Sequence, residues 1–536
     1  MITCRFRQLL FIIPLLALLS GVAFAQDDNS SPSLGDVARH LRKETSDEIR
    51  MTDADAKKLF ASVDTIFAFA AEDTGMPKRA VVKRQMVSKA DVEKFTTGRM
   101  AKEEFTQRFA QEELSLKKLG FLPREFNLRE FLVKSTGQEI AGYYDEETKT
   151  ISLLNWVPFD HQEPILAHEL THALQDQNYD LKKWMRAPLP SQKDGAKKDV
   201  ADADGAVDDG ATARKAAVEG QAMVVYVDYV LAPLGRNLAD TPELIYQMEE
   251  PAVKAVADSQ MMHDAPMILR ESGSFAYNDG LIFEGELLHK GGKEMAFAGV
   301  FARPPRNSHE VLHPEVYINN EKTPRVGLPD LKTILGDQYG VYDSGGVGEL
   351  DVRALLKQYG ERKIADEVSA AWQGGAYETY LRKGKTAGAS PTTADLALVY
   401  VSKWKSPQAA ERFARFYANA VGRRYNTAEV QPASACSGTN CPASSAQVMT
   451  EEGPVLIERW NNSVVVSEGF DTTTAGKIQN AFHDGSATGA QAETLPQQEI
   501  GLRLFDLPAF QDFADEIGRR VVLEMNVLEM KSPGSR

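Results

Sequence analysis

The pattern of hydrophobic and polar positions divides the chain into regions of different secondary structure. Residues 53–120 follow a mostly helical pattern. Residues 141–154, AGYYDEETKTISLL, predict two short strands joined at residues 145–147. The next helix contains the sequence HELTH. We expect it to begin between Asp160 and Pro164, because Asp160 can cap it and proline is tolerated in a first helical turn.

The second half of the chain contains further contrasts of this kind. Residues 193–212 are rich in Asp, Gly and Ala and predict a mobile acidic insertion on the surface. Residues 215–234, KAAVEGQAMVVYVDYVLAPL, predict a very apolar helix. From about Asp395, the order strand, helix, three strands and short helix predicts a small α+β unit, with Asn461 and Asn462 at a hairpin turn. This unit contains no evident catalytic group, so packing or recognition is its expected role.

The HELTH sequence has the spacing of a metal site. Residues four apart lie on one face of a helix, so His168 and His172 can both face one ion. Imidazole nitrogens are suitable ligands for Zn²⁺. Glu169 is rotated away from the two histidines, and it could take a proton from an attacking water as a general base. An ordinary amphipathic helix with a hydrated polar side would show a similar pattern.

A catalytic zinc site needs a third protein ligand, and Glu219 is our candidate. It is the only charged residue in the apolar run AAVEGQAMVVYV, where an unpaired carboxylate would be costly. Either Zn²⁺ or a nearby cation, Arg214 or Lys215, would neutralise it. Gly220 would let this helix approach the HELTH helix closely. Asp176 is the rival ligand, but we expect it to accept a hydrogen bond from an imidazole N–H instead.

Composition and charge narrow the class of protein. The 536 residues are 43% hydrophobic and 26% charged, which is typical of folded protein, and the length suggests two to four structural units. A net charge of -15 argues against nucleic acid or an anionic membrane as the main partner, because both favour basic patches.

The N-terminus predicts export. Residues 1–25 comprise a short basic region, an apolar run and small residues at a cleavage position after Ala25, as in a signal peptide. No later stretch is long and apolar enough to cross a bilayer. In an oxidising compartment, Cys436 and Cys441 of the sequence CSGTNC could close a small disulfide loop. We therefore expect a periplasmic or extracellular protein.

These motifs together resemble a known group. HELTHALQDQ, preceded by AGYYDEETKTI and followed by an EGxA helix, is similar to secreted bacterial zinc metallopeptidase-like proteins of gluzincin type, most of them uncharacterised. Further similar segments are PPRNSHEVLHPEVY, GELDVRALL and AAWQGGAYETY, so the resemblance covers roughly residues 121–380. In gluzincins an Asp usually follows the third-ligand Glu by four residues, but here that position is Met223, which leaves the surroundings of Glu219 open.

Peptide hydrolysis also needs a donor for the oxyanion that develops in the transition state. The resemblance suggests His313 and Tyr317, of which His313 is our preferred candidate. Tyr143, Tyr144 and Tyr277 are alternatives. The remaining histidines, His309 among them, we expect to be ordinary surface or packing residues.

The sequence therefore predicts an exported zinc metallopeptidase of α+β fold. Its expected units are a signal peptide (1–25), an N-terminal helical region (26–120), a zincin-like metallopeptidase domain (121–390) and a C-terminal α+β unit (391–536). His168, His172 and Glu219 would bind Zn²⁺, with Glu169 as base and His313 as oxyanion donor. The expected partner is a peptide or protein substrate, and the oligomeric state stays open.

Two other functions fit the same residues. The first is a zinc hydrolase that acts on a non-protein amide or ester, such as a cell-wall component. The second is a non-catalytic envelope binding protein in which zinc only stabilises the fold. Glu169 argues against the second function, because a structural zinc site has no need of a base.

Overall fold

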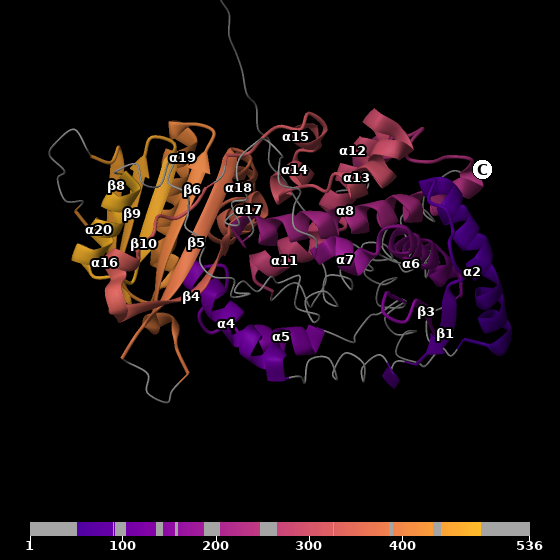
Figure 1. The fold of residues 1–536 in the computed structure, drawn as a ribbon, viewed down its shortest axis with the longest axis horizontal. Helices are drawn as coiled ribbons and strands as arrows, with labels where there is room; N and C mark the ends of the chain where they lie inside the picture. Colours follow the sequence, from indigo (N-terminus) through magenta and orange to yellow (C-terminus); the bar gives the residue numbers. More distant parts are fainter. Residues whose placement is uncertain are drawn as a thin grey trace, which may run out of the picture. The chain divides into compact units, whose positions relative to one another are not determined.

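The structure is a computed structural model that combines helices with β-sheets, as an α+β fold requires (Figure 1). The residues that it describes are 51–88, 90–91, 103–135, 143–155, 159–186, 204–246, 265–324, 326–384, 390–432 and 441–483. The predicted signal peptide lies outside these ranges. None of the helices in these ranges has the length and apolar character needed to span a membrane.

A three-stranded sheet stands next to the HELTH helix. Its order is β1 (Lys83–Val87), β3 (Thr150–Leu154) and β2 (Tyr143–Asp145), so β2 is an edge strand. β2 and β3 form the predicted antiparallel pair, whereas β1 pairs with β3 in parallel. Every residue of β3 is buried, as expected of a central strand. The region up to residue 120, which we predicted to be helical, therefore also supplies a strand to this sheet.

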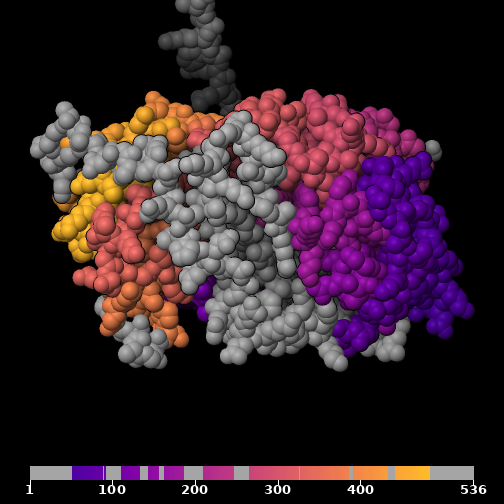
Figure 2. Space-filling view, in the orientation of Figure 1, coloured from indigo at the N-terminus to yellow at the C-terminus, as the bar shows by residue number. Residues whose placement is uncertain are grey.

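Four helices pack together around the HELTH sequence. α6 (Phe159–Tyr179) contains HELTH, and it packs against α2 (Asp53–Thr74) and α8 (Asp204–Leu231). α8 packs in turn against α12 (Asn278–Lys293). Figure 2 shows α2, in indigo, exposed on one side of the molecule. The apolar faces of these helices share one hydrophobic core with part of the larger sheet.

The larger sheet has seven strands in the order β4-β5-β6-β10-β9-β8-β7. The interior strand β6 is buried on both faces, since alternate side chains belong to two different hydrophobic clusters. α19 packs against the sheet and contributes to one of these clusters, and α20 packs against the sheet and contributes to the other. The predicted elements from Asp395 onward are present, but β7 is an additional strand that we did not predict. Asn461 has a positive φ of 52° at the predicted hairpin turn. The bounds are β4 (Tyr339–Gly346), β5 (Trp372–Arg382), β6 (Leu396–Trp404), α19 (Pro407–Arg424), β7 (Ala428–Gln431), β8 (Ser444–Thr450), β9 (Gly453–Trp460), β10 (Ser463–Glu468) and α20 (Thr472–His483).

Two predicted boundaries differ from the structure. The expected domain border at residue 390 cuts through the seven-stranded sheet, because β4 and β5 precede it and pair with β6. The predicted mobile insertion at 193–212 is helical from Asp204, where α8 begins, and Asp209 and Ala211 are buried. Burial of these residues against the rest of the protein overrides their polar composition. Residues 193–203 lie outside the described residues.

Gly220 also has a different neighbour from the one we expected. It does allow a close helix approach, but to α12 rather than to the HELTH helix. A Cβ atom at Gly220 would lie 2.2 Å from the carbonyl oxygen of Gly280. Hence the contact between α8 and α12 depends on glycine at both positions.

The other elements connect these parts. Cys441 is disulfide-bonded, as expected, and Cys436 lies outside the described residues. The remaining bounds are α4 (Glu103–Leu119), α5 (Leu128–Ser135), α7 (Leu181–Arg186), η2 (Ala232–Leu234), α11 (Met267–Phe275), η3 (Glu294–Gly299), α13 (Val300–Ala302), α14 (Ser308–Leu312), α15 (Pro314–Ile318), α16 (Lys332–Leu335), η4 (Gly336–Gln338), α17 (Glu349–Tyr359), α18 (Arg362–Ser369) and η5 (Thr393–Asp395).

Candidate metal centres

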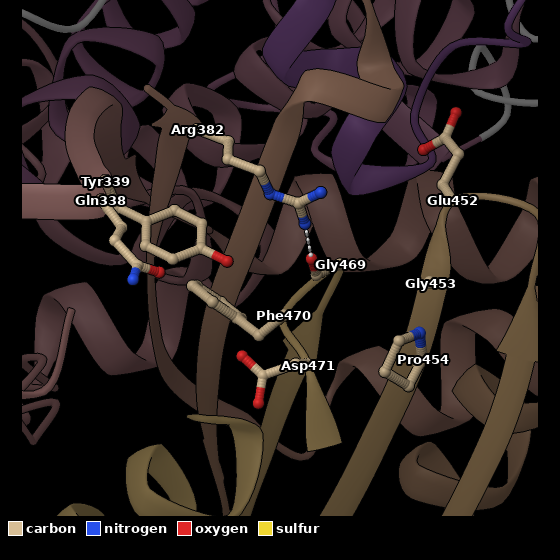
Figure 3. Close-up of a pocket in the computed structure, with 9 residues that line it drawn as sticks. All are labelled: Gln338, Tyr339, Arg382, Glu452, Gly453, Pro454, Gly469, Phe470 and Asp471. Atoms are coloured by element: carbon tan, nitrogen blue, oxygen red, sulfur yellow. Dashed lines mark hydrogen bonds between the residues drawn. The ribbon is translucent and has the colours of Figure 1, made fainter. Parts of the chain in front are cut away.

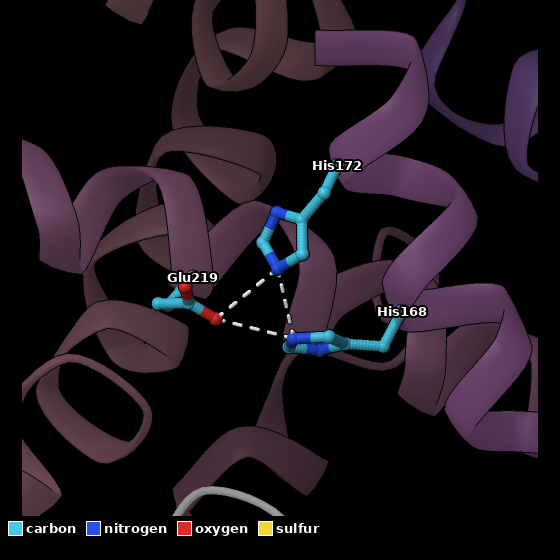
Figure 4. A group of neighbouring side chains, drawn as sticks. All are labelled: His168, His172 and Glu219. Atoms are coloured by element: carbon cyan, nitrogen blue, oxygen red, sulfur yellow. Dashed lines mark hydrogen bonds and ion pairs between the residues drawn. The ribbon is translucent and has the colours of Figure 1, made fainter. Parts of the chain in front are cut away.

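The HELTH helix and α8 bring three potential ligands together (Figure 4). His168 and His172 project from α6, and Glu219 projects from α8. The two Nε2 atoms lie 3.1 Å apart, and Oε2 of Glu219 lies 3.1 Å and 3.3 Å from them. These three residues form a group that could hold a metal ion.

The spacing of these atoms fits a tetrahedral zinc ion. With Zn–N and Zn–O bonds of roughly 2.0–2.1 Å, neighbouring ligand atoms of a tetrahedron lie about 3.3 Å apart. The three separations come close to that value. Two imidazole nitrogens and one carboxylate oxygen are also a ligand set that catalytic zinc sites use.

A buried glutamine orients His172. Nδ1 of His172 lies 2.8 Å from Oε1 of Gln175, which can only accept a hydrogen bond. The amide nitrogen of Gln175 donates to the carbonyl of Val218 and to Oε1 of Gln221, so the amide cannot turn over without losing both bonds. In the neutral imidazole that a metal ion would need, the proton of His172 therefore lies on Nδ1, and the Nε2 lone pair faces the site. We did not predict this role for Gln175 from the sequence.

Charges around Glu219 are balanced from two sides. Its Oε2 faces the histidines, while its Oε1 forms an ion pair with Nζ of Lys215 at 2.7 Å. The two partners that the sequence left as alternatives, a metal and Lys215, thus address different oxygens. Burial disfavours the charged carboxylate, but Lys215 and His172 outweigh burial and hold the pKa of Glu219 well below its usual range. Burial lowers the pKa of His172, but Glu219 raises it to about 9 overall.

The predicted base is held by the edge strand of the small sheet. Oε2 of Glu169 accepts a hydrogen bond from the backbone N–H of Tyr144 in β2, at 2.9 Å. Glu169 is buried and is not one of the three potential ligands. Asp176 does not accept the imidazole N–H as we expected. Its Oδ2 accepts from the hydroxyl of Tyr144 at 2.9 Å and from Lys149 at 2.5 Å.

A second group with the same composition lies elsewhere in the structure. His309, His313 and Glu349 also form a cluster that could hold a metal ion. His309, which we expected to be an ordinary residue, is 3% exposed, and its Nδ1 contacts Oε2 of Glu349. Nε2 of His313 lies 3.1 Å from both oxygens of Glu349. The sequence contained a signal for this group, because HEVLH repeats the spacing of HELTH.

The candidates for the oxyanion donor lie in different places. The side chain of His313 makes polar contacts with Glu349 and Glu315, which places it at the second group and not at the first. Tyr317 is buried and donates to the carbonyl of Arg303. Tyr277 is the candidate that touches the first group: its ring stacks with that of His168 at a centroid separation of 6.2 Å.

The seven-stranded sheet carries a cavity of about 330 Å³ (Figure 3). Arg382 lines it and donates to the carbonyl of Gly469 at 2.6 Å. Its lining includes the acids Glu452 and Asp471 but no residue of either His/His/Glu group. This cavity is therefore separate from the candidate metal centres.

Comparisons with known proteins leave the chemistry open. A family model described as a domain of unknown function (DUF8575) matches residues 337–479. The match begins just before β4 and ends within α20, so it covers all seven strands of the larger sheet. No curated protein and no solved structure matches the chain.

Proposed function

We propose that this protein is a zinc-dependent hydrolase of zincin-like fold that cleaves peptide bonds. The observation that carries the proposal is the triangle of two Nε2 atoms and one carboxylate oxygen, with sides of 3.1–3.3 Å, formed by His168, His172 and Glu219. Zn²⁺ held by these three residues would supply Lewis acidity for a substrate carbonyl and for water. The signal peptide predicted at residues 1–25 supports export to the periplasm or the medium.

Glu169 is the general base in this proposal. It is adjacent to His168 in the chain, and the N–H of Tyr144 holds one of its oxygens. A carboxylate held in this way can take a proton from the attacking water and later deliver it to the leaving amine. A structural zinc site has no need of a base, so the presence of Glu169 next to the metal ligands favours catalysis over a purely structural zinc.

Tyr277 is the group that we propose as the oxyanion donor. Its ring packs against His168, and its phenol is a donor of the kind found in oxyanion holes. It takes the place of His313, whose imidazole contacts Glu349 of the second group. The substrate would lie along β2, the edge strand whose Tyr144 N–H bonds to the base.

The proposal is tested with purified wild-type protein and Glu169→Gln. Zinc content is measured in both, and each is incubated with a mixed peptide library whose products are identified by mass spectrometry. A matched control is Glu163→Gln, which makes the same change on the same helix. We expect equal zinc in all three proteins, with cleavage by the wild type and the control and none by Glu169→Gln.

The other outcomes separate the alternatives. Equal zinc without peptide cleavage by any protein would favour the non-protein amide or ester, which a panel of such substrates would then reveal. Cleavage by Glu169→Gln at the wild-type rate would remove Glu169 as the base. Absence of zinc from the wild type would contradict the proposal as a whole.

A further inference from the structure

We propose that His309, His313 and Glu349 bind a second divalent metal ion of the zinc class, which has a structural role. The ion would fasten the region 337–479 to the helices around the first group. The chain contains the HExxH spacing twice, as HELTH and HEVLH, and each copy meets a glutamate from another helix.

The ligand geometry supports a shared ion. Both imidazoles converge on one carboxylate, with His309 in contact with Oε2 and His313 Nε2 at 3.1 Å from both oxygens. The three ligand atoms lie within 4.8 Å of one another. His309 and Glu349 are 3% and 2% exposed, whereas the His313 side chain is 23% exposed, which leaves a path for an ion to enter. This set matches the nitrogen and oxygen ligands that zinc prefers.

A buried acid next to the cluster supplies independent support. Asp209 is 8% exposed, and its Oδ2 is buried with no hydrogen-bond partner among the described residues. Its Oδ1 accepts from the N–H of Ser308, the residue before His309. A Cβ atom at Gly348, the residue before Glu349, would lie 2.3 Å from this carboxylate. Asp209 thus lies against the residues that precede two of the proposed ligands, and a buried carboxylate with one oxygen left without a partner favours a cation there.

The second site lacks the free base of the first. Glu310 occupies the position that Glu169 has in HELTH, but Arg306 engages it through its backbone N–H, its Nε and its terminal guanidinium nitrogen. Glu310 is 1% exposed. Donors of Arg306 thus occupy both oxygens of Glu310, which leaves neither oxygen free to receive a proton from water. Hence the second ion would bind without a hydrolytic role.

The position of the ligands indicates what the ion would join. His309 lies in α14, which packs on α8 and α12, and His313 follows it directly. Glu349 is the first residue of α17, which packs on β5 and α19. His309 also packs against Trp372, the first residue of β5, with ring centroids 5.9 Å apart. Two ligands therefore precede the matched region 337–479 and one lies inside it.

The experiment counts zinc ions per chain. Wild-type protein, Glu349→Gln, Glu219→Gln and the double variant are dialysed against buffered Zn²⁺, checked for folding by circular dichroism and analysed by atomic emission. We expect two ions in the wild type, one in each single variant and none in the double variant. If Glu349→Gln does not fold, His313→Ala takes its place, since that side chain is partly exposed.

The result that overturns the inference is one ion in the wild type that only Glu219→Gln removes. The opposite result, in which Glu349→Gln loses an ion and Glu219→Gln loses none, would support the second site and contradict the first. Anomalous diffraction at the zinc edge from wild-type crystals decides the matter without any variant. A peak among His309, His313 and Glu349 supports the inference, and the absence of a peak there contradicts it.

Discussion

Gln175 offers a sharp test of how the first metal group is oriented. The side chain is fully buried and makes three hydrogen bonds: it accepts from Nδ1 of His172 and donates to Val218 and Gln221. Gln175→Leu keeps a similar volume and removes all three. The imidazole of His172 then has no acceptor to hold its proton on Nδ1, so the tautomer with Nε2 free for the metal loses its advantage.

Two magnitudes follow from this geometry. Loss of a hydrogen bond that orients a ligating imidazole weakens metal binding by about 10–100-fold, which is about 1.4–2.7 kcal/mol. The substitution also leaves buried polar groups without a hydrogen bond. Their loss of partners should lower the free energy of unfolding of the metal-free protein by about 2–4 kcal/mol in total. Both effects should appear together, because the same side chain serves both purposes.

The assay is a zinc titration in competition with a chromophoric chelator, with denaturant unfolding of the metal-free protein beside it. Gln177→Leu is the matched control: it is the same change two residues along α6, where the side chain bonds to the backbone of Ala80 instead of His172. The control should bind zinc as the wild type does. If folded Gln175→Leu binds zinc within threefold of the wild type, Gln175 does not set the tautomer and the reasoning is refuted.

Three further predictions concern helix packing, pH and catalysis. Gly220→Ala should lower the free energy of unfolding by about 1–3 kcal/mol, because the added methyl group would clash with α12. Gly422 lies at an exposed helical position with open space around it, so Gly422→Ala should raise the free energy of unfolding by about 0.5–1 kcal/mol. Denaturant unfolding measures both changes. Burial and the neighbouring Asp73 raise the pKa of Asp228 from 3.8 to about 8, so the folded state holds a proton that the unfolded state releases. Stability from this group is full below pH 4 and is lost as the pH rises through 8; Asp228→Asn should flatten the fall between pH 5 and 8, and an unchanged slope would contradict the assignment. Tyr277→Phe should reduce kcat about 10²–10³-fold with zinc content unchanged, and a wild-type kcat would exclude Tyr277 as the oxyanion donor.

Local patterns in the sequence predicted the elements of the fold well. The strand pair at Tyr143–Leu154, the HELTH helix and the alternation of elements after Asp395 depend on periodicity and turn residues within a few positions of one another. The grouping of His168 with His172 has the same origin, because helical geometry alone places them on one face. Glu219 could be singled out for a related reason, since a lone carboxylate in an apolar helix needs a partner.

Other features depended on contacts between distant residues. The parallel pairing of β1 with β3 and the pairing of β5 with β6 across residue 390 join segments whose own sequences do not name their neighbours. Gly220 showed that a close approach was needed but not that α12 would make it. The predicted hydrogen-bond partner of Asp176 was wrong for the same reason. Lys149 and the hydroxyl of Tyr144 contact Asp176 from outside its own helix.

The second His/His/Glu group depends both on a local sequence pattern and on contacts between distant residues. The sequence by itself determined the spacing of HEVLH, which repeats that of HELTH. Only the tertiary structure decided that Glu349 meets these histidines and that Arg306 neutralises Glu310. The physical reason is that helix and strand periodicity is a short-range property of the chain. A ligand set or an ion pair is completed instead by the packing of elements far apart in sequence, which no local pattern contains.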